Sequence, residues 1–83
     1  MINIINVKPL KEYRLLLTFQ NGEIKVFDMK PFLNKGIYKA LVDENIFNSV
    51  TISFDTIEWK NVADIDPEFL YTKSIQCGNE FKV

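Results

Sequence analysis

Hydrophobic and polar residues alternate most clearly on the two sides of the dipeptide Asn21-Gly22. These two residue types tolerate the positive φ angles of a tight hairpin turn better than others do. We therefore predict an antiparallel hairpin of residues 12–20 and 23–28, joined by a two-residue turn.

The two-residue turn also decides which side chains share a face of this hairpin. Phe19 is expected to face Ile24, and Leu17 to face Val26, on one apolar face. Lys25 is expected on the opposite, polar face. This register is therefore a specific prediction about which residues enter the core.

The neighbouring segments predict one more strand and two short helices. Residues 2–7 are rich in β-branched side chains and precede Pro9, which lacks the amide hydrogen that a sheet ladder needs. Ile37 and Leu41 have helical spacing, and residues 43–47 can begin a second helix at an aspartate cap. We expect both helices to pack on the sheet, since helices this short are marginal alone.

Residues 50–54 and 57–60 predict a second hairpin, because alternate positions in both segments are apolar. A tight turn at Asp55-Thr56 places Ile52 opposite Trp59. The flanking charges of Trp59 are mixed in sign, so we expect this ring in the core and not as a stacking platform for nucleic acid.

The segment Ile65-Asp66-Pro67 predicts the start of a closing helix. Asp66 can cap the free amides of a helix, and Pro67 suits the first helical position. The side chains of this region that we expect to face the core are Phe69, Leu70 and Ile75.

Together these elements predict an α+β fold. It consists of a small antiparallel sheet, formed by a β-meander and a second hairpin, with two or three short helices. We expect residues 1–75 to form a single domain and residues 76–83 to form a loose C-terminal tail.

Charge and composition narrow the classes of function. The 10 basic and 11 acidic residues are interspersed and give a net charge of −1, so we expect no direct nucleic-acid binding. No apolar run approaches the roughly 18 residues of a membrane span, and Cys77 has no partner for an internal disulfide. We therefore expect a cytoplasmic protein that does not bind a membrane.

The chain has no histidine, which is the usual general base near neutral pH and a common metal ligand. No phosphate loop or activated nucleophile is recognisable either. We therefore expect no enzymatic activity, no catalytic residues and no cofactor.

Acidic residues around the closing helix offer one alternative. Asn61, Asp64 and Asp66 could form a loop that binds a small molecule or, together with Glu68, a metal ion. Helix capping accounts for Asp66 and Glu68 more simply, because both stand where a helix N-terminus favours acidic side chains. We therefore predict no metal site, and the ligand loop stays an alternative.

Several aromatic and aliphatic residues belong either to the core or to a surface that contacts a partner protein. Leu16 and Phe27 face each other near the open end of the first hairpin, on its otherwise polar face, and need to be covered. Aromatic residues are enriched at interface centres. The full candidate surface consists of Tyr13, Leu16, Phe27, Phe32 and Tyr38.

Two motifs resemble the small bacterial domain-of-unknown-function family 2442. They are F-x-N-G followed by F-D within residues 19–28, and W-x-N-x-A-D-x-x-P-E-x-L-Y at residues 59–71. Val62 departs from the pattern, because a glycine is usual there. The resemblance implies a compact α+β fold with no established catalytic residues. Relatives in that family are often encoded beside a small toxin.

These observations favour a non-enzymatic protein-interaction module. The resemblance implies that it is the antitoxin of a bacterial toxin–antitoxin pair, with a small toxin as its partner and a homodimer as its free state. The alternative, from another class of function, is a domain that binds a small molecule or metal through Asn61, Asp64 and Asp66.

Overall fold

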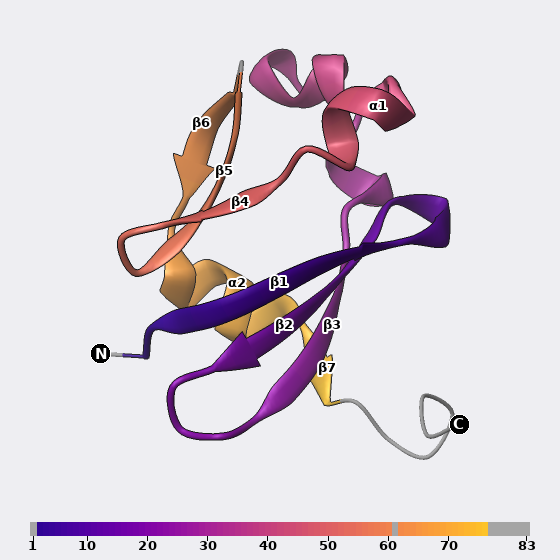
Figure 1. Ribbon diagram of the computed structural model, residues 1–83. Helices are drawn as coiled ribbons and strands as arrows, with labels where there is room; N and C mark the ends of the chain where they lie inside the picture. The colour runs from indigo at the N-terminus through magenta and orange to yellow at the C-terminus, as the bar shows by residue number, and fades with distance from the viewer. Residues whose placement is uncertain (1, 61, 77–83) are drawn as a thin grey trace.

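A computed structural model describes residues 2–60 and 62–76, without the side chains of residues 62–64. Two antiparallel sheets with short helices confirm the α+β prediction (Figure 1). The four-stranded sheet has the order β1 (Ile4–Leu10), β2 (Arg14–Phe19), β3 (Ile24–Asp28) and β7 (Ile75–Gln76). The three-stranded sheet has the order β4 (Thr51–Ser53), β5 (Thr56–Trp59) and β6 (Val62–Ile65).

The helices are all short. The α-helices are α1 (Glu44–Phe47) and α2 (Pro67–Lys73), and the 3-10 helices are Lys11–Tyr13, Lys30–Phe32 and Gly36–Val42. Residues 77–83, which include Cys77 and most of the predicted tail, lie outside the described residues.

The predicted meander of β1, β2 and β3 is confirmed, but β1 continues through Pro9 to Leu10. Its expected end before Pro9 is therefore wrong. Among the residues that the structure describes, β1 pairs within its sheet with β2 alone, so it is an edge strand, where a missing amide hydrogen is tolerated. The ladder also shifts between Ile4 and Asn6, which makes this edge irregular.

The register predicted for the first hairpin is wrong by one residue. Leu17 faces Lys25, because the loop contains three residues, 20–22. The Gly22 amide donates to the Phe19 carbonyl at 2.9 Å, and Gly22 has a φ of +94°. Three-residue hairpin loops commonly combine a turn with a left-handed residue at this position, which glycine adopts without strain.

The one-residue shift exchanges the two faces of β3. Lys25 lies on the core face and is only 8% exposed, whereas Ile24 lies on the other face and is 43% exposed. Side chains alternate along a strand, so any change of one residue in register moves every side chain to the opposite face.

The second hairpin is confirmed, but its turn lies at Phe54-Asp55. Ile52 faces Ile57, two positions away from its predicted partner Trp59. A shift of two residues preserves the faces, and Trp59 is buried in the core as predicted. Sequence analysis did not predict β6, which pairs with β5.

The closing helix begins at Pro67 as predicted, with the Asp66 side chain accepting a hydrogen bond from the Glu68 amide. Leu70 is buried in the core and Phe69 packs against it. The prediction for Ile75 is wrong: the helix ends at Lys73, and Ile75 belongs to β7.

The first predicted helix is a 3-10 helix at Gly36–Val42, in which only Leu41 is buried. Ile37 is 59% exposed, so its predicted packing on the sheet is wrong. A 3-10 helix has three residues per turn, and this changes which side chains share a face. The predicted Asp43 cap of the next helix is confirmed, because its side chain accepts from the Asn45 amide.

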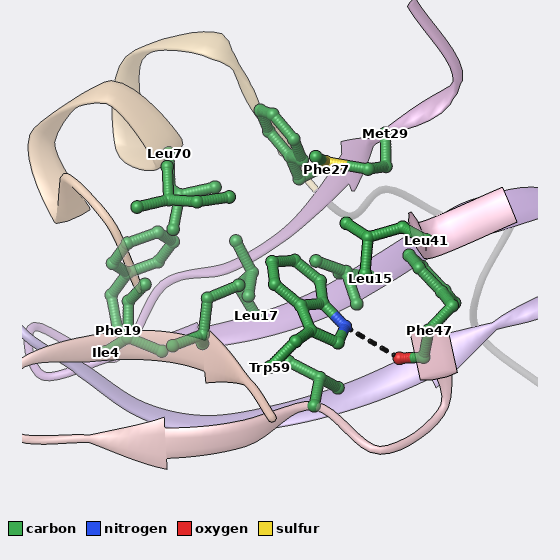
Figure 2. Packing of buried hydrophobic residues seen from close by; sticks show 13 residues of the cluster. Ile4, Leu15, Leu17, Phe19, Phe27, Met29, Leu41, Phe47, Trp59 and Leu70 are labelled. Atoms are coloured by element: carbon green, nitrogen blue, oxygen red, sulfur yellow. Dashed lines mark hydrogen bonds between the residues drawn. The ribbon is translucent and has the colours of Figure 1, made fainter. Parts of the chain in front are cut away.

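The core lies between the inner face of the four-stranded sheet, the second sheet and the helices (Figure 2). The Trp59 Nε1 atom donates to the Phe47 carbonyl at 2.8 Å, which joins the second sheet to α1. The buried cluster consists of Ile4, Leu15, Leu17, Phe19, Phe27, Met29, Leu41, Phe47, Val50, Ile57, Trp59, Ile65 and Leu70.

Candidate functional site

The five residues predicted to contact a partner do not form one surface. Phe27 is 1% exposed in the core, because of the shifted hairpin register, and Phe32 stacks on it with ring centroids 5.7 Å apart. Tyr13 and Tyr38 are partly buried and pack against the core. Leu16 alone lies on the opposite face of the sheet, so the predicted patch reduces to Leu16 on that face.

A row of four side chains crosses the outer face of the four-stranded sheet at the position of Leu16. Lys8 on β1 pairs with Leu16 on β2, Leu16 pairs with Val26 on β3, and Val26 pairs with Ile75 on β7. Residues paired across a sheet point to the same side. We call Lys8, Leu16, Val26 and Ile75 the outer row.

The outer row lies outside the core. Among the described residues, its three apolar members neither belong to the buried cluster nor pack against it. Ile75 is 71% exposed, and Ile24 adds a further exposed side chain one row away. Adjacent strands are about 4.8 Å apart, so the apolar part of the row, from Leu16 to Ile75, spans roughly 10 Å.

Val26 and Ile75 are absent from the predicted candidate surface. The two-residue turn that the sequence predicts places Val26 in the core. The prediction for Ile75 places it in the core beside the closing helix, although β-branched residues favour strands. Only the correct loop length brings Leu16 and Val26 together on one face.

Of the three residues predicted to form a ligand loop, Asp66 is the one whose side chain the structure describes. Asn61 lies outside the described residues, and Asp64 is on β6 with its side chain not described. Asp66 caps α2, accepting from the Glu68 amide at 3.2 Å. Among the residues that the structure describes, no group of three His, Cys, Asp or Glu side chains could hold a metal ion.

A polar network ties β7 and α2 to the loop of the first hairpin. The Glu23 carboxylate accepts hydrogen bonds from the Tyr71 hydroxyl, the Gln76 side-chain amide and, at 2.8 Å, the Asn21 side-chain amide. The Tyr71 hydroxyl, followed by Asn21, lowers the pKa of Glu23, and the same contact with the carboxylate raises the pKa of Tyr71. Glu23 therefore stabilises the attachment of the segment that carries Ile75.

We expect the contribution of Glu23 to stability to depend on pH. Because its pKa is lowered in the folded state, the contribution is present above the unfolded pKa and is lost as pH falls through the folded pKa. The measurement is thermal unfolding of the wild type and Glu23→Gln between pH 7 and pH 2. The difference in melting temperature should shrink as the pH falls.

Glu58→Gln is the matched control, because Glu58 is an exposed carboxylate on β5. Its difference from the wild type should be small at every pH. A Glu23→Gln difference that stays constant down to pH 2 contradicts this account of the network.

No helix among the described residues is long and apolar enough to cross a membrane.

Comparison with protein-family models matches residues 4–76 to the family described as "Protein of unknown function (DUF2442)". No curated protein and no solved structure matches the chain.

Proposed function

The chain belongs to the DUF2442 family, a family of unknown function, and from this premise we propose that it is a non-enzymatic protein-interaction module of the cytoplasm. Its partner binds the outer face of the four-stranded sheet. The absence of histidine from the sequence supports a function without acid–base chemistry.

The observation that supports this proposal is the outer row. Leu16, Val26 and Ile75 adjoin one another on three neighbouring strands, and the fold provides no core contact for them among the described residues. Contiguous apolar side chains on a sheet face are a common feature of protein interfaces. Binding a partner there removes this apolar area from water.

The charges around the row indicate what the partner should offer. Lys8 stands at the β1 end of the row and is exposed, without an ion pair among the described residues. Asp28, on the same face, already forms an ion pair with Lys30 at 3.2 Å. We therefore expect the partner to present an apolar strip with an acidic side chain at the end that meets Lys8.

The finer proposal is that this partner is a small toxin, so that the chain acts as its antitoxin. Support comes from the family resemblance and from the outer row. The test is co-expression with the product of the adjacent small gene. We expect that product to arrest growth alone, and the chain to relieve the arrest and to co-purify with it.

A matched pair of variants locates the interface. Ile75→Glu places a charge in the outer row and should abolish co-purification, whereas Ile37→Glu changes an exposed isoleucine on the 3-10 helix and should preserve it. If the wild type neither relieves toxicity nor co-purifies, the antitoxin proposal is wrong. If both variants bind equally well, the partner uses another surface.

A further inference from the structure

The loop of the first hairpin contains an asparagine followed directly by a glycine. Asn21 and Gly22 are both exposed. Apart from the adjacent residues, the part of the chain that the structure describes places no heavy atom within 4 Å of the position that a Gly22 Cβ atom would have. A backbone nitrogen can attack the side-chain amide of the asparagine before it, because the five-membered ring that forms has little strain. Glycine hinders this attack least, since it has no Cβ atom.

Glu23 holds the side-chain amide of Asn21 at both of its polar atoms. The Glu23 backbone amide donates to Asn21 Oδ1 at 3.0 Å, and Asn21 Nδ2 donates to Glu23 Oε1 at 2.8 Å. Attack at Asn21 Cγ moves negative charge onto Oδ1, and a backbone amide at this distance stabilises such a charge. The fold therefore supplies an activating hydrogen bond to the carbonyl group that the Gly22 nitrogen would attack.

The attacking nitrogen itself takes part in one hydrogen bond of the loop. The Gly22 amide donates to the Phe19 carbonyl at 2.9 Å, so this bond has to open before the nitrogen can lose its proton and turn towards Asn21. An exposed loop opens locally at a small free-energy cost, without unfolding of the core. The bond therefore slows the reaction in the folded chain but does not prevent it.

We propose that Asn21 is a site of spontaneous deamidation, and that the product loosens β7 from the first hairpin. The Gly22 amide gives its proton to hydroxide, and its nitrogen forms a bond to Asn21 Cγ. The Cγ–Nδ2 bond then breaks, and ammonia leaves with a proton from water. Water opens the resulting succinimide at either carbonyl, which gives aspartate or isoaspartate at position 21. The net reaction consumes one water molecule and releases one ammonia.

The Glu23 carboxylate connects this reaction to β7. It also accepts hydrogen bonds from the Tyr71 hydroxyl and the Gln76 side-chain amide. Deamidation removes the Nδ2 donor and places a second carboxylate beside Glu23, and these like charges repel each other. Because β7 pairs with β3 through two residue pairs, its attachment depends strongly on these side-chain bonds. Aspartate at position 21 therefore weakens the attachment of β7.

Isoaspartate has a further effect, on the backbone of the loop. Its main chain runs through the former side chain and is one carbon longer than that of an ordinary residue. A loop with this extra atom cannot keep both the Gly22–Phe19 hydrogen bond and the register of β2 and β3. Isoaspartate therefore loosens β7 more than aspartate does. The inference concerns the attachment of β7, and it stands whether or not the outer row binds the proposed partner.

The first test follows the intact wild type during several weeks at neutral pH and body temperature. Peptide mapping by mass spectrometry measures the conversion of each asparagine. Asn21 should convert at least about tenfold faster than Asn48, which corresponds to about 1.4 kcal/mol in the activation barrier. Asn48 is the matched control, because it is also exposed but precedes Ser49, whose side chain hinders the attack. Equal rates at the two positions, or no conversion in the folded chain, would overturn the proposal.

The second test measures the attachment of β7 in the products. Ion exchange separates the deamidated forms, since each carries one more negative charge than the wild type. Amide hydrogen exchange at residues 75–76 should become about five- to tenfold faster, whereas exchange in α1 should not change. Asn21→Asp supplies the aspartate product directly and should show the smaller increase. If exchange in β7 is the same in the deamidated forms as in the wild type, the proposal is wrong.

Asn21→Gln distinguishes deamidation at this position from other effects of ageing. Its side chain is one carbon longer, so the Gly22 nitrogen would have to form a six-membered ring, which is a much slower reaction. Compared with itself before and after the same incubation, this variant should keep its hydrogen exchange in β7. If ageing loosens β7 in Asn21→Gln as much as in the wild type, a different change is responsible and the proposal fails.

Discussion

Replacing Trp59 with alanine is expected to lower the free energy of unfolding by about 3–5 kcal/mol. The side chain is buried, stacks on Phe47 with centroids 6.1 Å apart, and donates to the Phe47 carbonyl. Its removal leaves a cavity between the second sheet and α1. Since small domains are stable by only about 5 kcal/mol, the variant should be largely unfolded. Urea denaturation followed by far-ultraviolet circular dichroism measures the loss.

Trp59→Phe separates the packing of the ring from its hydrogen bond. It keeps an aromatic ring against Phe47 but removes the hydrogen bond from the indole to the Phe47 carbonyl. This carbonyl still accepts a longer hydrogen bond, at 3.4 Å, from the Val50 amide. We expect a loss of about 1–2 kcal/mol from the bond and the smaller ring. If the free energy of unfolding of Trp59→Ala lies within about 1 kcal/mol of the wild-type value, this account of Trp59 as a major part of the core is wrong.

Replacing Lys25 with alanine is expected to cost about 2–3 kcal/mol, an unusually large effect for a lysine. Its Nζ donates to the Tyr71 carbonyl at 2.6 Å and lies 3.9 Å from the centre of the Tyr71 ring. Tyr71 is in the last turn of α2, where carbonyl groups lack partners within the helix and favour a cation. The substitution removes this cap and uncovers the surface under the lysine stem.

Lys25→Met isolates the contribution of the charged group. It keeps most of the apolar stem, and the Ser74 hydroxyl remains at 3.2 Å from the Tyr71 carbonyl, so we expect a loss of about 1 kcal/mol. Lys39→Ala, on the exposed 3-10 helix, should change stability by less than about 0.5 kcal/mol. Equal losses for Lys25→Ala and Lys39→Ala, measured by the same denaturation, contradict this account.

The position of Lys25 also shows where sequence reasoning reaches its limit. Leu15, Leu16 and Leu17 are all apolar, so alternation along β2 cannot decide which of them face the core. The loop length decides this, and Asn-Gly is compatible with loops of two or three residues. The partner of Lys25 on α2 is 46 residues away in the chain, and no local pattern reveals it.

Local signals were reliable where the physical cause was local. The Asp66 cap and Pro67 predicted the start of α2, and the Asp43 cap predicted the start of α1. The two-residue strand β7 is too short to show any periodicity. The backbone at Glu12 is left-handed, although glycine and asparagine are the residues that usually indicate this conformation. Sequence analysis therefore predicted the architecture and found one apolar member of the outer row, Leu16, but not the row itself.

The order of strands in the larger sheet has a consequence for folding. The strands β1, β2 and β3 are consecutive in the chain, but β7 joins β3 only after the entire second sheet and α2 have been traversed. Bringing such distant segments together costs more chain entropy than forming a hairpin, so we expect β7 to add last. A nascent or partly folded molecule would therefore lack Ile75 beside Val26, and only chains that have completed this long-range closure would present the whole outer row to the proposed partner.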